Sequence, residues 1–250
     1  MFWSAGKRRR EPASDPASQL LTYPPAELNP PSPGPIHSWA RPAAFALVVL
    51  AGAVLLWIAL GPHDVADYHA ESDFLGGYAE GARGVQSGHL DPARYQVVGP
   101  VYEIAIALVG FVTRDLSLAG KLVSVTAACG SLLLWFLLLE RRSGPVAGLW
   151  TLAFLAVNPV FVRYGSSMTT DMLATLVQAA ALFALFGRHG RRAPLWAGVL
   201  TGVAVLTRYN AIYLVPAVLV SDAWRSPAGA GSRLRTGVRF AAGFAAVTLP

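Results

Sequence analysis

The chain has 250 residues, of which 54% are hydrophobic and only 14% charged, and its formal net charge is +6. A typical globular chain is about one quarter charged, and here the apolar residues form uninterrupted runs about as long as a bilayer is thick. These properties exclude a disordered chain, a disulfide scaffold, a collagen-like repeat and a cytosolic enzyme. The single cysteine, Cys129, lies in an apolar run, so no intrachain disulfide can form.

Residues 1–42 differ in composition from the rest of the chain. They hold nine of the eighteen prolines and a basic cluster at residues 7–10, and no apolar residue recurs at helical or strand spacing. We therefore expect a disordered, proline-rich cytoplasmic tail. A docking arm for a partner is the alternative.

The first apolar run, residues 43–60, is eighteen residues long and uncharged. About 17–25 such residues cross a bilayer as a helix. No small-residue cleavage site follows the run, so we predict an uncleaved signal anchor.

The segment 61–116 is the most acidic part of the chain. It contains eight of the fourteen acidic residues and three arginines, a net charge of −5. A loop of this length is large enough to fold into a lid, and such loops usually carry function. Within it, residues 100–112 are apolar but include Glu103, and we predict a juxtamembrane or re-entrant helix. The alternative for most of these carboxylates is a solvated, charge-balanced loop.

Later apolar runs predict six more membrane spans, the last of them incomplete, at residues 122–139, 144–162, 172–187, 193–207, 209–221 and from 240 onward. The predicted fold class is thus all-α: a polytopic transmembrane helix bundle with a large extracytoplasmic first loop carrying juxtamembrane helices. We expect residues 43–250 to form one transmembrane domain that is incomplete at its C-terminus. The spacing Gly198-x-x-x-Gly202 allows close helix packing, but it is common by chance in such sequences.

The basic residues predict the orientation of this bundle. Fourteen of the twenty Lys and Arg residues lie in four segments that alternate with outer ones, 1–42, 140–143, 188–192 and 222–239. The outer segments carry five. This distribution follows the positive-inside rule and places the N-terminus in the cytoplasm and the acidic loop outside. Because the basic residues follow topology, nothing supports nucleic-acid binding.

Charged residues at the outer edge of the spans are the candidate site residues. Asp171 directly precedes the run 172–187. An acid there stabilises a helix N-terminus, with Thr169 or Thr170 as N-cap, yet ionisable groups at a membrane edge are also retained for function. Both interpretations remain open.

Three cations stand at the same level: Lys121, Arg163 and Arg208. Each can extend its head group to the membrane interface. Together they can also bind an anionic head group, because a guanidinium donates two hydrogen bonds to a phosphate at once.

The order and spacing of several short motifs resemble a known family. The motifs are Ser72-Asp73-Phe74, Tyr78-Ala79, Gly88-His89, Gly99-Pro100-Val101-Tyr102, Lys121-Leu122, Arg141-Arg142, Asn158-Pro159, Arg163-Tyr164, Thr170-Asp171-Met172 and Leu206-Thr207-Arg208-Tyr209-Asn210. Over about residues 43–250 the chain resembles polytopic glycosyltransferases of the protein O-mannosyltransferase and aminoarabinose-transferase type, which use lipid-linked sugars and have a GT-C fold.

The resemblance implies transfer of a sugar, such as mannose, from a polyprenyl-phosphate carrier to a hydroxyl of a protein, lipid or glycan acceptor, outside the membrane and with inversion. Asp73 and Asp171 match the acids of the two outer loops and are the predicted catalytic residues, with Asp73 as general base. The predicted ligands of the lipid phosphate are Arg163, Arg208, Lys121 and Tyr102. A divalent cation is an open part of this prediction, and its ligands are unknown.

The chain departs from the family pattern at two places. Phe74 follows Asp73 where the family commonly has Glu, and Val98-Gly99-Pro100 stands where a Lys-Pro-Pro or His-Pro-Pro motif is common. A further group, His63, Asp64, Asp67 and His69, offers metal-ligand atoms at a spacing that matches no common zinc pattern.

Two other functions remain as alternatives. A transporter or flippase for a lipid-linked or anionic solute would use the same outer cations, but transporters usually place charges near the bilayer midplane and contain internal repeats. The second alternative is a non-catalytic, truncated paralogue.

Overall fold

The computed structural model describes residues 36–63, 71–95, 98–187, 190–225 and 230–249, without the side chains of 36–38 and 221–233. These residues belong to one compact unit, 36–250. Every regular element in the described ranges is a helix. The predicted all-α membrane bundle is therefore confirmed, while residues 1–35 of the predicted tail lie outside the described part of the chain.

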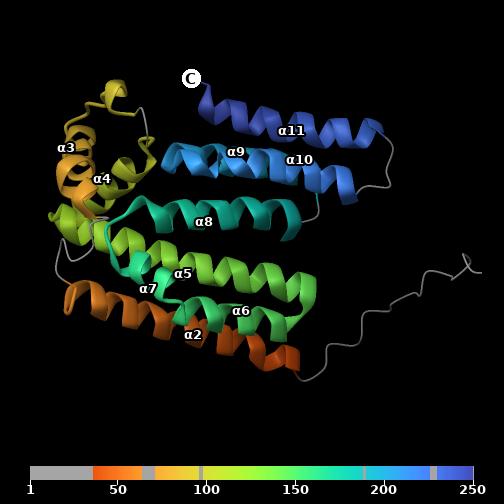
Figure 1. The fold of residues 1–250 in the computed structure, drawn as a ribbon, viewed down its shortest axis with the longest axis horizontal. Helices are drawn as coiled ribbons and strands as arrows, with labels where there is room; N and C mark the ends of the chain where they lie inside the picture. Colours follow the sequence, from red (N-terminus) through yellow and green to blue (C-terminus); the bar gives the residue numbers. More distant parts are fainter. Residues whose placement is uncertain (1–35, 64–70, 96–97, 188–189, 226–229, 250) are drawn as a thin grey trace, which may run out of the picture. The chain divides into compact units, whose positions relative to one another are not determined.

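The bundle consists of helices that run alternately in opposite directions (Figure 1). Its central helix is α5 (Leu116–Ser143), which packs against α2 (Ile36–Leu60), α6 (Pro145–Val157) and α8 (Thr170–Leu182). The packing continues from α8 to α9 (Ala193–Thr207) and from α9 to α11 (Ala230–Thr248), with α10 (Leu214–Arg225) beside them.

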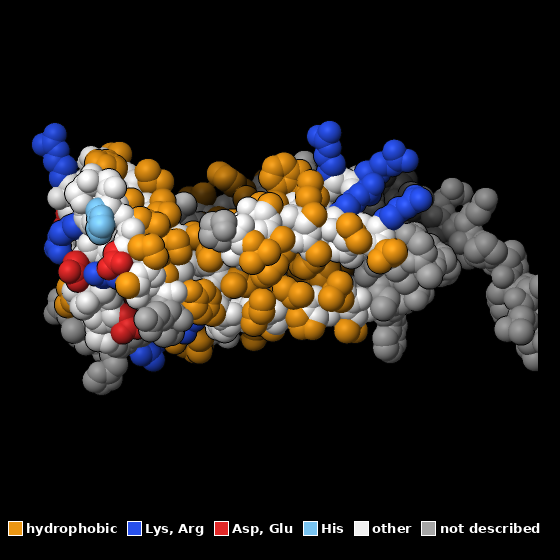
Figure 2. All heavy atoms as spheres, turned by 90° about the horizontal axis from the view of Figure 1, so that it is seen from above, with side chains coloured by type: hydrophobic (Ala, Val, Ile, Leu, Met, Phe, Trp, Pro, Cys, Tyr) orange, Lys and Arg blue, Asp and Glu red, His pale blue; other side chains and the backbone are white. Residues whose placement is uncertain are grey.

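Three helical stretches are long and apolar enough to cross a membrane: Trp39–Leu60, Leu116–Ser143 and Thr170–Gly187. The predicted runs 193–207 and 209–221 form shorter apolar helices instead, Ala193–Thr207 and Tyr209–Val220. Hydropathy identifies apolar runs but does not measure the length of the helix that they form. Exposed apolar side chains cover the flanks of the bundle between its charged ends, as expected for a surface facing lipid (Figure 2).

The predicted span 144–162 is bent, which is a correction to the sequence prediction. Helix α6 ends at Val157, and α7 (Pro159–Ser166) leaves it at an angle of 65°. Proline lacks the N–H of a helical residue and disfavours helical geometry in the residue before it. Asn158 is accordingly extended, and its side chain accepts hydrogen bonds from the amides of Val160 and Phe161 at 3.0 and 3.1 Å, capping α7.

A group of short elements packs at one end of the bundle, and we call residues 71–95 and 98–113 the cap. It contains η2 (Phe74–Tyr78), α3 (Ala79–Gln86), η3 (Pro92–Arg94) and α4 (Val101–Thr113). Helix α4 matches the predicted short helix at 100–112 and, at thirteen residues, spans only about 20 Å. A buried cluster with Phe74, Tyr102 and Met168 joins the cap to α5.

Glycines allow α9 and α11 to approach closely. A Cβ at Gly198 would lie 2.0 Å from the Phe240 carbonyl oxygen, and one at Gly243 would lie 2.1 Å from that of Leu195. Gly202 also faces α11, with Val247 at 3.0 Å. The Gly198-x-x-x-Gly202 spacing therefore marks a real helix contact.

We expect Gly243→Ala to separate α9 from α11, because its Cβ would meet backbone atoms that cannot rotate away. Overpacking of this kind costs about 1–3 kcal/mol, which a lowered thermal transition of the purified chain in detergent would show. Gly237→Ala in the same helix is the control, since its Cβ would meet only the Leu219 side chain at 3.9 Å. Equal stability of the two variants would contradict the close contact.

Candidate functional site

A cleft of about 590 Å³ lies where the cap meets the helix ends. The cap contributes Asp73, Tyr78 and Val98 to its wall, and the bundle contributes Tyr164, Thr169, Thr170, Asp171, Arg208, Tyr209 and Asn210. Two predicted catalytic residues and one predicted phosphate ligand thus line the same cleft.

Asp171 and Arg208 form an ion pair within the cleft. Asp171 lies in the first turn of α8, and Arg208 is the C-cap residue of α9. The guanidinium also lies 3.4 Å from the Thr170 hydroxyl. The two side chains remain 26% and 39% exposed, so the pair contributes little to stability. Its main effect is to fix the direction of the Arg208 guanidinium, which has further N–H groups to donate.

Thr169 occupies the N-cap position of α8, as predicted, but its side chain makes no capping hydrogen bond. Its hydroxyl is buried at the cleft wall and has no hydrogen-bond partner among the described residues. Buried polar groups are nearly always paired. A polar ligand in the cleft would satisfy this one.

The Asp73 carboxylate is available for chemistry. Asp73 precedes η2, but its side chain makes no capping hydrogen bond. It forms no hydrogen bond or ion pair with any other residue in the described ranges. This distinguishes it from Asp171, whose charge is already paired with Arg208.

Tyr78 stands beside these acids. Its ring packs edge-on against Tyr102, with ring centroids 5.2 Å apart. Burial raises the pKa of Tyr78, and the negative charge of Asp73 raises it further. Tyr78 therefore keeps its proton across the neutral pH range and can act as a hydrogen-bond donor in the cleft.

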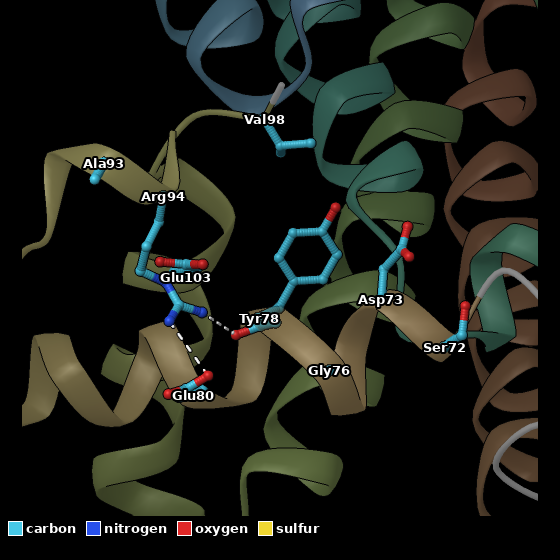
Figure 3. A pocket seen from close by; sticks show the side chains of 10 residues that line it. Ser72, Asp73, Gly76, Tyr78, Glu80, Ala93, Arg94, Val98 and Glu103 are labelled. Carbon is cyan, nitrogen blue, oxygen red and sulfur yellow. Dashed lines mark hydrogen bonds and ion pairs between the residues drawn. The ribbon is translucent and has the colours of Figure 1, made fainter. Parts of the chain in front are cut away.

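A second, larger cavity of about 820 Å³ is also lined by Tyr78 (Figure 3). Arg94 crosses it, pairing with Glu80 at 3.3 Å and donating to the Gly77 carbonyl at 2.9 Å. Glu103 accepts a hydrogen bond of 2.7 Å from the Tyr95 hydroxyl, and burial raises the pKa of Glu103.

Three residues belong to the walls of both openings: Asp73, Tyr78 and Val98. The cleft and the second cavity are therefore adjacent, and Asp73 is part of the wall of each.

Two contacts hold the cap against the end of α9. A Cβ at Gly99 would lie 2.0 Å from the Leu206 carbonyl oxygen, so only glycine lets the chain pass there. The Tyr209 hydroxyl donates a hydrogen bond to the Tyr95 carbonyl. The Val98-Gly99-Pro100 sequence, which departs from the family motif, thus has a packing role.

The other predicted phosphate ligands do not line the cleft or the second cavity. Tyr102 has no exposed surface and packs behind Tyr78. Arg163 is exposed, with its guanidinium 5.9 Å from the centre of the Tyr164 ring, and Lys121 is partly buried near the start of α5. Their assignment stays a prediction.

Some residues of the cleft were not predicted from sequence. Tyr78, Tyr209 and Asn210 stand in the motifs that carry the family resemblance. Their presence in those motifs could have identified them as site residues, but they are uncharged and the prediction of site residues relied on charged side chains. Thr169 was predicted only as a helix cap.

The proposed metal ligands are largely untested. Asp64, Asp67 and His69 lie outside the described residues. In the described ranges no three His, Cys, Asp or Glu side chains are grouped to hold a metal ion. The cleft itself offers only two carboxylates, one of them paired with Arg208.

A family model described as dolichyl-phosphate-mannose-protein mannosyltransferase matches residues 97–249, more than half of the chain. The match includes Asp171 and Arg208 and begins after Asp73. Among curated proteins and among solved structures, none matches the chain significantly.

We expect Tyr209→Phe to loosen the cap, because it removes the hydrogen bond to the Tyr95 carbonyl. Loss of one such bond costs about 1 kcal/mol, which corresponds to an about fivefold larger population of molecules in which the cap is detached from the end of α9. Cleavage after Arg94 by trypsin should accelerate by that factor. Tyr213→Phe is the control, since its hydroxyl bonds Gln178 at 2.6 Å and does not touch the cap. Equal cleavage rates in both variants would contradict this role.

Proposed function

Because the chain belongs to the dolichyl-phosphate-mannose-protein mannosyltransferase family, we propose that it transfers a sugar, such as mannose, from a polyprenyl-phosphate carrier to a protein hydroxyl. The observation that carries the proposal is the cleft itself. It brings an unpaired carboxylate, Asp73, together with an oriented guanidinium, Arg208.

In the proposed reaction, the acceptor oxygen attacks the anomeric carbon while its proton passes to the Asp73 carboxylate. The bond between the anomeric carbon and the phosphate oxygen breaks, and the carrier leaves as a phosphate anion. Attack from the face opposite the phosphate inverts the anomeric centre. A positioned base of this kind contributes about 10²–10⁴-fold to a rate.

The leaving phosphate gains negative charge as this bond breaks, and Arg208 is the residue placed to stabilise it. A guanidinium fixed in advance needs no reorganisation during the reaction. Asp171 holds Arg208 by the ion pair and acts here as a positioning residue. The Thr169 hydroxyl and the neutral Tyr78 supply further hydrogen bonds to the donor.

The second cavity suits the acceptor. Asp73 lines this cavity as well as the cleft. The donor and acceptor then meet at Asp73, Tyr78 and Val98 without competing for one volume.

The charge distribution supports an active site on the extracytoplasmic face. Arg41, Arg141 and Arg142 lie at the bundle end opposite the cap, where Arg41 pairs with Glu140 at 3.0 Å. Positive residues mark the cytoplasmic side of membrane proteins. In this orientation the N-terminus is cytoplasmic, and the cap lies at the extracytoplasmic face of the membrane.

We expect Asp73→Asn to lower transfer by at least about 10²-fold, because the amide cannot accept the hydroxyl proton. The measurement is transfer of radiolabelled mannose from polyprenyl-phosphate mannose to a hydroxyl-containing peptide, in membranes that contain the full chain. Donor binding should stay within about threefold of wild type, since the base does not hold the phosphate.

Asp115→Asn is the matched control. Asp115 caps α5 through the amides of Ser117 and Leu118, and asparagine caps a helix equally well. Full activity of Asp73→Asn would remove this residue from the site. Donor binding without transfer by the wild-type chain, to peptide, lipid or glycan acceptors, would instead favour a carrier protein.

We expect Arg208→Gln to weaken binding of polyprenyl-phosphate mannose by about 10–100-fold, since a charge-assisted hydrogen bond contributes about 1.5–3 kcal/mol. Arg208→Lys should recover only part of this loss, because an ammonium lacks the planar fork. Arg163→Gln and Lys121→Gln, both outside the cleft lining, should have smaller effects. Equal donor affinity of Arg208→Gln and wild type would exclude Arg208 as the phosphate ligand.

A further inference from the structure

Glu71 is a fully buried residue whose carboxylate has no role in the proposed reaction. Its exposed fraction is 0%. One carboxylate oxygen accepts a hydrogen bond from the Met168 amide at 2.9 Å, and the other lies 3.0 Å from Nε2 of His63. A carboxylate accepts hydrogen bonds only, so the His63 ring carries its hydrogen on Nε2 in this contact.

These two contacts join three separate parts of the chain. His63 follows α2, and its backbone amide bonds the Ile58 carbonyl at 3.0 Å, which ties it to the end of that helix. Glu71 opens the cap. Met168 belongs to the loop between α7 and α8. One side chain thus connects the first membrane helix, the cap and the loop before α8.

The connected residues directly precede the two site acids. Glu71 is two residues before Asp73, and Met168 is three residues before Asp171. Met168 and Phe74 also rest together on Gly120 of α5, where an added Cβ would meet them at 3.2 and 2.8 Å. A shift of either segment would therefore move an acid of the cleft.

A role in stability alone is a poor explanation for Glu71. Burial of a charged carboxylate has a large desolvation cost, and well-packed apolar residues of similar volume often serve stability equally well. A hydrogen bond to one particular backbone amide, however, specifies a position that apolar packing does not. Glu140, whose side chain is 6% exposed, makes its ion pair far from the cleft.

We propose that Glu71, held by His63, is a positioning residue that sets the distance between Asp73 and the Asp171–Arg208 pair through the Met168 amide. The inference rests on the proposed function for its catalytic consequence, but the geometric link can be measured without activity. It predicts a defect in turnover with nearly normal donor binding, because Glu71 touches neither substrate.

The test compares Glu71→Met with Glu71→Gln in the full chain, reconstituted in lipid nanodiscs. Methionine fills the space but accepts no strong hydrogen bond, whereas the glutamine oxygen can still accept from the Met168 amide. We expect Glu71→Met to lower kcat for mannose transfer by about 10–100-fold, the effect of a small misplacement of reacting groups. Its affinity for polyprenyl-phosphate mannose should stay within about threefold of wild type, and Glu71→Gln should restore most of kcat.

Amide hydrogen exchange of the peptide around Met168 is the second readout. It should be accelerated in Glu71→Met and near wild type in Glu71→Gln. Glu140→Met is the matched control, because Glu140 is also a buried, paired carboxylate, with a side chain 6% exposed. It lies twenty residues along α5 from Gly120, about 30 Å away, and should change neither readout.

Wild-type kcat in Glu71→Met would overturn the proposal, as would unchanged exchange at Met168. An equal loss of kcat and donor affinity in both variants would also overturn it, since that pattern indicates general structural damage. If Glu71→Met does not fold, the Met168 amide must still exchange its hydrogen more slowly in Glu71→Gln than in Glu71→Ala. If the wild-type chain transfers no sugar, the proposed function fails, while the exchange experiment still decides the role of Glu71.

Discussion

Hydrocarbon cannot hydrogen-bond to a peptide group, and this constraint shapes both the fold and the position of the site. A chain that crosses a bilayer must satisfy its own backbone, which helices do. Some hydroxyls within these helices also bond to the backbone of their own helix: Ser131 donates to the Ala127 carbonyl and Thr201 to that of Ala197, both at 2.8 Å. In the described part of the chain, most charged side chains accordingly lie at helix ends and in connecting segments, with Arg235 and Arg239 of α11 as exceptions, and the cleft lies among the charged residues at the cap end.

The same constraint explains how the Asp171 carboxylate and the Arg208 guanidinium come to face each other at the cap end of the bundle. Helices α8 and α9 are antiparallel neighbours, so the N-terminus of one lies beside the C-terminus of the other. The partial positive charge of the first end favours Asp171, and the partial negative charge of the second favours Arg208. Each residue is stabilised by its own helix before the two interact, and their ion pair then links the two ends.

Sequence patterns predicted the helical class and the short helix in the acidic loop, while the family resemblance named Asp73, Asp171 and Arg208 as site residues. Hydropathy registers apolar runs without the helix ends, so the runs 193–207 and 209–221 form shorter helices than the other spans, and the bend at Pro159 was present in the sequence but outweighed by the apolar run around it. The two cavities could not be predicted, because their walls depend on contacts between distant residues. Tyr209 and Tyr95, which share a hydrogen bond, are 114 positions apart in the sequence. Gly99 can approach the Leu206 backbone closely only because glycine has no Cβ.

The shared wall of Asp73, Tyr78 and Val98 has a consequence for kinetic order. If, as proposed, the donor occupies the cleft and the acceptor the second cavity, both substrates contact these three residues at the same time, and the proposed transfer takes place in a ternary complex. In that scheme the spent carrier would return to the membrane while the modified acceptor would leave through the larger opening.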